Sequence, residues 1–220
     1  MPTAFRVAMA LCISTLLAGI GANAQSLPKE VATRAEIYPI PSLTLSDQQF
    51  LSGDAVAGKP VTVAGEFRVA QGTGKLPVVV LMHGSSGVGA TTEAWVHAFN
   101  AMGISTFVID GFTGRGLTVV GPNQALLGRL NLIVDIYRSL EILAKHPRVD
   151  PDRIVLMGFS RGGQAALYAS LDRFNKLWNK SGVQFAAYIP FYPDCSTGYL
   201  TDTEVAARPT PDLPRHARRL

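Results

Sequence analysis

The sequence predicts an α/β fold in which a mostly parallel sheet is flanked by helices. Short apolar runs alternate with helical patterns along the chain, which is the order of elements that parallel sheets require. The run 76–82 is continuously apolar, as in a central strand buried on both faces, and segment 153–168 has the pattern of a strand, a sharp turn and a helix. With 47% hydrophobic residues in 220, the chain can form one sizeable core.

The N-terminus has the pattern of a secretory signal. Arg6 precedes an apolar run over 7–20, and Ala22-Asn23-Ala24 offers a small-x-small cleavage site. The run is too short for a membrane span, so we expect no span and an exported protein, periplasmic or secreted. The expected organisation is a signal peptide at 1–24, an N-terminal extension at 25–59, the α/β domain at 60–205 and an irregular basic tail at 206–220.

The composition implies no nucleic acid, metal or organic cofactor. The chain has 20 Lys and Arg against 16 Asp and Glu, but residues 25–204 hold 15 of each, without a basic stripe. Glu93 and His97 lack zinc-protease spacing, and segment 53–60 has proline where a phosphate-binding loop needs Ser or Thr. Cys195 is the single cysteine after the signal; it is either a buried small hydrophobe or a thiol that has lost its partner.

Three further strands follow from apolar and β-branched patterns. Segment 61–69 alternates like a half-exposed strand, while 104–110 and 183–192 are more continuously apolar. Residues 39–41 are expected to be extended because two prolines flank Ile40.

Helical periodicity marks the segments between these strands. We expect one short helix within 43–51, a helix at 92–102 with Trp95, Val96 and Phe99 in the core, and a long helix at 123–145. His146-Pro147 ends the long helix. Its expected buried stripe consists of Leu126, Leu127, Leu130, Ile133, Val134, Tyr137, Leu140, Ile142 and Leu143.

Ser160 is the candidate nucleophile. It lies in Gly158-Phe159-Ser160-Arg161-Gly162, between a strand that begins near Arg153 and a helix expected to run to Phe174. This is the G-x-S-x-G nucleophile elbow, in which a tight, strained turn presents the serine hydroxyl above the sheet edge. The N-terminus of the following helix favours an oxyanion. The alternative is a glycine-rich turn with a solvent-exposed serine.

A glycine-rich loop, His83-Gly84-Ser85-Ser86-Gly87-Val88-Gly89, follows the central strand. At the carboxyl end of that strand it can place the backbone N–H of Ser85 opposite that of Arg161, and the two would form an oxyanion hole. The alternatives are a plain strand-to-helix connection and a dinucleotide-binding loop. The second does not fit, because the G-x-G-x-x-G spacing is missing.

Asp110 and Arg115 belong to the loop after strand 104–110. Both are expected at the carboxyl edge of the sheet, where they could line the substrate cleft. They could also pair with each other and brace the loop, which is the interpretation that we favour.

These elements and motifs resemble the α/β-hydrolase fold and, more narrowly, the dienelactone-hydrolase-related family. The resemblance covers residues 60–205 and implies hydrolysis of a small-molecule ester or lactone through an acyl-enzyme on Ser160, with His83 and Gly84 shaping the loop and no cofactor. Dienelactone hydrolases proper have cysteine at the elbow, so Ser160 points to general esterase chemistry. The likeness rests on His83-Gly84, the Asp110-x-Phe112-x-x-Arg115-Gly116 loop, residues 149–154, Gly158-Phe159-Ser160-Arg161-Gly162-Gly163 and Phe191-Tyr192-Pro193.

The end of the chain departs from this family, which continues with two more strands, the first followed by the catalytic acid and the second by the catalytic histidine. Residues 206–220 instead contain three prolines and four arginines, which do not suit buried parallel strands. We therefore expect a truncated or frame-shifted member that lacks the last strands and exposes the strand at 185–192 as an edge. Asp194 and His216 keep the order serine, acid, histidine and are the candidate acid and base, although His216 lies in a proline-broken tail.

Two hypotheses about function follow. The first is a serine hydrolase of carboxylic ester or lactone bonds that uses Ser160. The second is a catalytically inactive hydrolase scaffold with at most a ligand- or partner-binding role, because the family's acid and histidine are not found at their usual positions.

Overall fold

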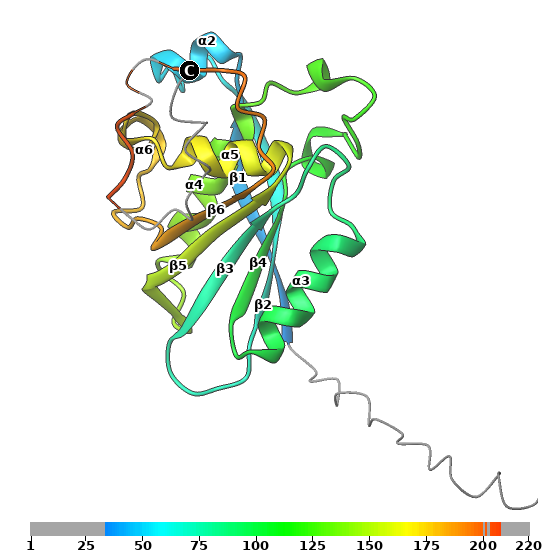
Figure 1. Cartoon of the computed structure of the whole chain (residues 1–220), viewed down its shortest axis with the longest axis vertical. Coiled ribbons are helices and arrows are strands. Elements are labelled where there is room, and N and C mark those ends of the chain that lie inside the picture. Colours follow the sequence, from blue (N-terminus) through cyan, green and yellow to red (C-terminus); the bar gives the residue numbers. More distant parts are fainter. Residues whose placement is uncertain (1–33, 200, 202, 208–220) are drawn as a thin grey trace, which may run out of the picture. The chain divides into compact units, whose positions relative to one another are not determined.

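The computed structural model describes residues 34–199, 201 and 203–207. Within them, six strands form one mixed sheet in the order β1-β2-β4-β3-β5-β6 (Figure 1). The pairs β1–β2 and β2–β4 are antiparallel, whereas β3 pairs in parallel with β4 and β5, and β5 with β6. The predicted mostly parallel sheet is therefore confirmed. The strands are β1 (Arg34–Thr44), β2 (Lys59–Val69), β3 (Leu76–Met82), β4 (Ser105–Asp110), β5 (Val149–Phe159) and β6 (Ala187–Phe191).

Helices cover both faces of the sheet (Figure 1). The continuous apolar sequence of β3 explains this, because successive side chains of a strand point to opposite faces. Val80 packs in the core with α4 and α5, whereas Leu81 packs in the core with α3. The helices are α2 (Asp47–Ser52), α3 (Ala90–Ala101), α4 (Asn131–Leu143), α5 (Arg161–Ala169) and α6 (Asp172–Trp178), with short 3-10 turns η1 (Thr113–Arg115) and η2 (Gln124–Leu126).

The sheet begins well before residue 60, within the segment expected to be an N-terminal extension. β1 pairs with β2 along its whole length, from Arg34 opposite Val69 to Thr44 opposite Lys59. The short helix expected within 43–51 is α2, which begins after Ser46; the Ser46 hydroxyl and the Gln49 side chain cap each other's backbone N–H groups.

The long helix predicted at 123–145 was wrong in its first part. The chain forms η2 there and enters α4 only at Asn131, because one local turn and one contact with a distant segment compete with the helix. Asn123 Oδ1 accepts a hydrogen bond from Ala125 N–H, and the Asn131 amide bonds both backbone groups of Leu45. As a result, Leu126 is 53% exposed rather than buried.

Other boundaries also moved. The elbow helix stops at Ala169 and a separate helix, α6, follows, while the strand predicted at 183–192 is reduced to β6. No helix of the described residues has the length and apolarity needed to cross a membrane. The predicted signal peptide, His216 and most of the predicted tail lie outside the described residues.

Candidate active site

Ser160 occupies the turn between β5 and α5. Its φ of 52° and ψ of −114° lie outside the regions that residues with a side chain prefer. The turn is held at both sides, since Ser160 N–H donates to Phe191 O on β6 at 3.0 Å and Ser160 O accepts from Gln164 N–H at 2.8 Å. Phe159 and Arg161 on either side are buried, whereas Ser160 is exposed. The geometry is that of a nucleophile elbow.

The glycines of the elbow are required by close backbone contacts. A Cβ on Gly162 would lie 2.3 Å from Met82 O and 2.4 Å from His83 O, and a Cβ on Gly158 would lie 2.1 Å from Gly162 O. Real Cβ atoms do not approach oxygen so closely, so the start of α5 can pack against the end of β3 only with glycine at position 162.

The loop after β3 lies directly against the elbow. Its Gly84 would, with a Cβ, come within 3.1 Å of Phe159 O and 3.4 Å of Ser160 Cβ. This proximity follows from the sheet order, because β3 and β5 are parallel neighbours and their carboxyl ends meet at one edge. The sequence-predicted loop and nucleophile are thus brought together.

His83 is buried, and both of its ring nitrogens are engaged. Nδ1 lies 2.8 Å from Gly84 O, to which it donates, and Nε2 accepts from Gly111 N–H at 3.1 Å. Burial lowers the pKa of His83, which keeps the ring neutral. Gly84 O and Ser85 N–H belong to the same trans peptide and point in opposite directions, so the bond from His83 fixes where the Ser85 N–H points.

The two N–H groups predicted for the oxyanion hole belong to Ser85 and Arg161. Within the described part of the chain, neither has a hydrogen-bond acceptor. Arg161 is the first residue of α5, where backbone N–H groups are not used by the helix and the helix dipole is positive. Both groups are therefore available as hydrogen-bond donors.

Asp194, the candidate acid, lies on the surface after β6. Hydrogen bonds from Ser196 and the nearby Arg129 guanidinium lower the pKa of Asp194, which is therefore ionised. Its Oδ2 is 2.6 Å from Arg129 Nη1, and its Oδ1 accepts from Ser196 N–H at 2.9 Å. Neighbouring Cys195 is exposed, so the alternative of a buried small hydrophobe was wrong.

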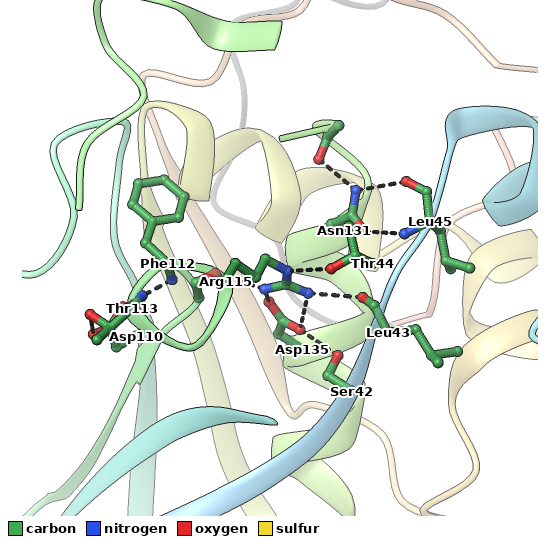
Figure 2. A network of polar contacts seen from close by, with 12 residues as sticks. Ser42, Leu43, Thr44, Leu45, Asp110, Phe112, Thr113, Arg115, Asn131 and Asp135 are labelled. Atoms are coloured by element: carbon green, nitrogen blue, oxygen red, sulfur yellow. Dashed lines mark hydrogen bonds and ion pairs between the residues drawn. The ribbon is translucent and has the colours of Figure 1, made fainter. Parts of the chain in front are cut away.

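The predicted pairing of Asp110 with Arg115 was wrong. Asp110 accepts hydrogen bonds from the N–H groups of Phe112 and Thr113 and from the Thr113 hydroxyl. Burial alone would raise the pKa of Asp110, but these bonds outweigh it and the pKa lies below its usual value. Arg115 turns instead toward Asp135 on α4 (Figure 2). The loop is short enough for Asp110 to cap its own turn, and this leaves the arginine for a more distant carboxylate.

The Arg115–Asp135 pair joins three parts of the molecule (Figure 2). Two nitrogens of Arg115 contact the two oxygens of Asp135, at 2.7 and 2.9 Å, and both side chains are buried. Arg115 also donates to Leu43 O on β1, to Thr44 Oγ1 and to Gly111 O. Since Gly111 N–H donates to His83, this network supports the loop that contains Ser85.

Sequence reasoning missed two residues near the site. Asp135 lies within the apolar stripe of the predicted long helix, and the stripe was interpreted only as core. A carboxylate among buried apolar residues is a usable signal of a buried ion pair. Gln124 carries no motif; its side chain lies between Ser85 and Arg161, 2.9 Å from Ser85 Oγ and 2.6 Å from Arg161 Nη1.

Comparisons with known proteins agree with this fold. A family model for acetyl xylan esterase (AXE1) matches residues 109–196, which include the elbow. A solved structure described as a dienelactone hydrolase from Klebsiella pneumoniae subsp. pneumoniae MGH 78578 has a TM-score of 0.58 at 15% identity and covers 82% of this chain and 71% of its own. A mutant of the esterase Est22 has a TM-score of 0.50 at 20% identity, covering 74% of this chain and 45% of its own.

An acetyl xylan esterase from Paenibacillus sp. R4 is 22% identical, with a TM-score of 0.46, over 74% of this chain. This chain spans 54% of that esterase and 60% of another solved relative, m3DLH. No curated protein matches the chain. The strand order and the similarity to the solved dienelactone hydrolase structure show that the chain has the α/β-hydrolase fold, and the matched family model makes residues 109–196 similar to the acetyl xylan esterases.

Proposed function

We propose that the chain is a serine hydrolase of carboxylic ester or lactone bonds, with Ser160 as its nucleophile. The observation that carries this proposal is the exposed Ser160 at φ 52°, held between β5 and α5 with the Gly84 loop against it. Such a strained conformation persists only where the surrounding structure enforces it, and it is typical of nucleophile elbows. The acetyl xylan esterase family model and the esterase structures support the same class of substrate.

The reaction would begin with attack of Ser160 Oγ on the carbonyl carbon. The carbonyl π electrons move to oxygen, and the N–H groups of Ser85 and Arg161 are the proposed donors to this oxyanion. Collapse of the tetrahedral intermediate releases the alcohol, which remains attached to the acyl group if the substrate is a lactone. Water then hydrolyses the acyl-enzyme and restores Ser160.

The Ser160 proton must pass to a base. His83 does not suit this role, since one of its ring nitrogens already donates and the other already accepts a hydrogen bond. His146 follows α4 and contacts Glu36 on β1, near the opposite end of the sheet. The sequence prediction for the base is His216, with Asp194 as the acid, and this assignment stays a prediction.

Hydrolysis of p-nitrophenyl acetate by the purified chain tests the proposal. We expect Ser160→Ala to lower kcat/KM by about 10³-fold or more, because the nucleophile is lost while the oxyanion donors remain. Ser52→Ala, at an exposed serine on α2, is the matched control and should match wild type. His216→Ala should lower the rate to a similar extent if His216 is the base.

A fluorophosphonate probe gives an independent readout of the nucleophile. The probe forms a covalent bond with an activated serine and releases fluoride, so mass spectrometry should find the adduct on the peptide that contains Ser160. Equal hydrolysis by wild type and Ser160→Ala, together with an unlabelled Ser160, would contradict the proposal and favour the inactive scaffold.

A further inference from the structure

The side chain of Gln124 connects the two segments that carry the proposed oxyanion donors. Gln124 Nε2 donates to Ser85 Oγ at 2.9 Å, and Gln124 Oε1 accepts from Arg161 Nη1 at 2.6 Å. One amide group therefore bonds a side chain of the loop after β3 and a side chain of the first residue of α5. A planar amide fixes the distance between its oxygen and nitrogen, so the two contacts constrain each other.

The segment around Gln124 holds Ser85 at a second point. Val120 N–H donates to Ser85 O at 2.8 Å, so Ser85 is fixed through both its carbonyl and its hydroxyl. Thr118 O of the same segment would lie 2.6 Å from a Cβ on Gly87, which shows how closely this segment packs on the loop. The position of the Ser85 N–H thus depends on contacts from residues 118–124.

Arg161 needs Gln124 because its guanidinium has few other partners. The residue is 5% exposed, and its other contacts are the carbonyl oxygens of Gln124 and Leu127. Its Nε has no hydrogen-bond partner within the described residues. Gln124 Oε1 is the one side-chain oxygen that binds Arg161 there, so its loss would leave a buried cation held by carbonyl groups alone.

We propose that Gln124 is a positioning residue that sets the spacing of the Ser85 and Arg161 backbone N–H groups. The inference rests on the proposed hydrolase function and goes beyond it, because Gln124 belongs to none of the motifs that indicate that function. Gln124 is itself exposed on η2, so its truncation should disturb the site without unfolding the protein.

Steady-state kinetics of Gln124→Ala measures the effect. We expect kcat to fall about tenfold with KM within about twofold, because a displaced donor weakens binding of the transition state more than binding of the substrate. Leu126→Ala is the matched control on the same turn, with a side chain that is 53% exposed, and should leave both constants unchanged. Gln124→Glu should restore most of kcat, since a carboxylate can accept from both Arg161 and the Ser85 hydroxyl.

A double-mutant cycle shows whether Gln124 acts through Ser85. Ser85→Ala removes the hydroxyl and keeps the backbone N–H. If the two residues act together, the double variant should be little slower than Gln124→Ala alone. Fully additive losses would contradict the coupling.

Amide hydrogen exchange separates failure of this inference from failure of the proposed function. In Gln124→Ala we expect exchange over residues 83–90 to become at least about fivefold faster than in Leu126→Ala. An enzyme that depends on Ser160 but shows equal kcat for the two variants would overturn the role of Gln124 and leave the hydrolase standing. If wild type is inactive, the exchange result decides alone, and equal exchange in the two variants overturns the inference.

Discussion

Two buried arginines lie near the candidate active site, and their surroundings differ. Arg115 uses all three of its guanidinium nitrogens, in five hydrogen bonds that include both oxygens of Asp135. Arg161 has no carboxylate partner within the described residues, and its Nε is unpaired. Burial, together with the nearby Arg129, lowers the pKa of Arg161.

The difference suggests that Arg115 serves to hold the fold together, whereas Arg161 serves the proposed active site. A buried charge with a complete set of partners fixes its neighbours, and Arg115 does this for β1, the loop after β4 and α4. A buried charge with incomplete partners has an energetic cost, which is usual where a site is arranged for chemistry rather than for stability. Substitutions around Arg115 should therefore affect mainly stability, and substitutions around Arg161 should affect mainly activity.

Removal of Asp135 should have the largest effect on stability. Asp135→Ala leaves the Arg115 charge buried without its carboxylate, and we expect the free energy of unfolding to fall by about 3–5 kcal/mol. Urea denaturation measures this change. Glu141→Gln, which removes a partly exposed ion pair with Arg138, should cost about 1 kcal/mol or less. Similar losses in the two variants would show that the Arg115 network does not support the fold.

Replacement of each arginine by methionine tests the comparison directly. Arg115→Met leaves Asp135 charged and buried, so it should destabilise by about 3–5 kcal/mol. Arg161→Met should cost about 1–2 kcal/mol, because it leaves carbonyl and amide groups without partners but no unpaired charge. Thermal or urea unfolding of the two variants measures both losses. An equal loss of stability in the two variants would show that the two arginines do not differ in their contribution to the fold.

Ser160 adds a strained backbone to the proposed active site. Ser160→Gly should raise the free energy of unfolding by about 1 kcal/mol, because glycine adopts a positive φ without steric cost, although it also gains freedom in the unfolded chain. Ser160→Ala keeps the Cβ and is the control, with stability close to wild type. A glycine variant no more stable than the alanine variant would argue against strain at this turn.

The buried ring of His83 should make the stability of the protein depend on pH. Burial lowers its folded-state pKa below the unfolded value of about 6.5, so below that pH the unfolded chain binds a proton that the folded chain does not. Stability from this residue is therefore complete above about pH 7 and falls as the pH decreases toward the folded-state pKa.

Denaturation at pH 7 and pH 5 checks this dependence. His83→Asn retains a donor for Gly84 O and no longer titrates, so it should lose less stability between the two pH values than wild type. His97→Asn, on the exposed surface of α3, should behave like wild type. An unchanged pH dependence in His83→Asn would contradict the assignment of a neutral, buried ring.

Local patterns predicted the centre of the fold well. The run 76–82 coincides with β3, and the elbow was found because strand, serine and helix are adjacent in sequence. These features depend on short-range sterics and on burial of both faces of a strand. The adjacency of the Gly84 loop and Ser160 followed from the expected parallel order of the strands.

Contacts between distant residues were not accessible in the same way. The start of α4 depends on the Asn131 bonds with Leu45, 86 residues earlier, so helical periodicity alone extended the helix too far. The partner of Arg115 lies 20 residues away on a helix, and Gln124 reaches Ser85 across 39 residues. Polar side chains of this kind carry no periodicity, and their partners emerge only when the chain is folded.

The bonds from Arg115 to Leu43 and Thr44 have a practical meaning for protein engineering. Through Gly111 and His83 they connect the end of the first strand to the loop that contains Ser85, which lies against the proposed nucleophile Ser160. Random libraries aimed at the catalytic loops should therefore also sample positions 42–44. If the proposed hydrolase activity holds, we expect variants selected there to change turnover through the loop that contains Ser85.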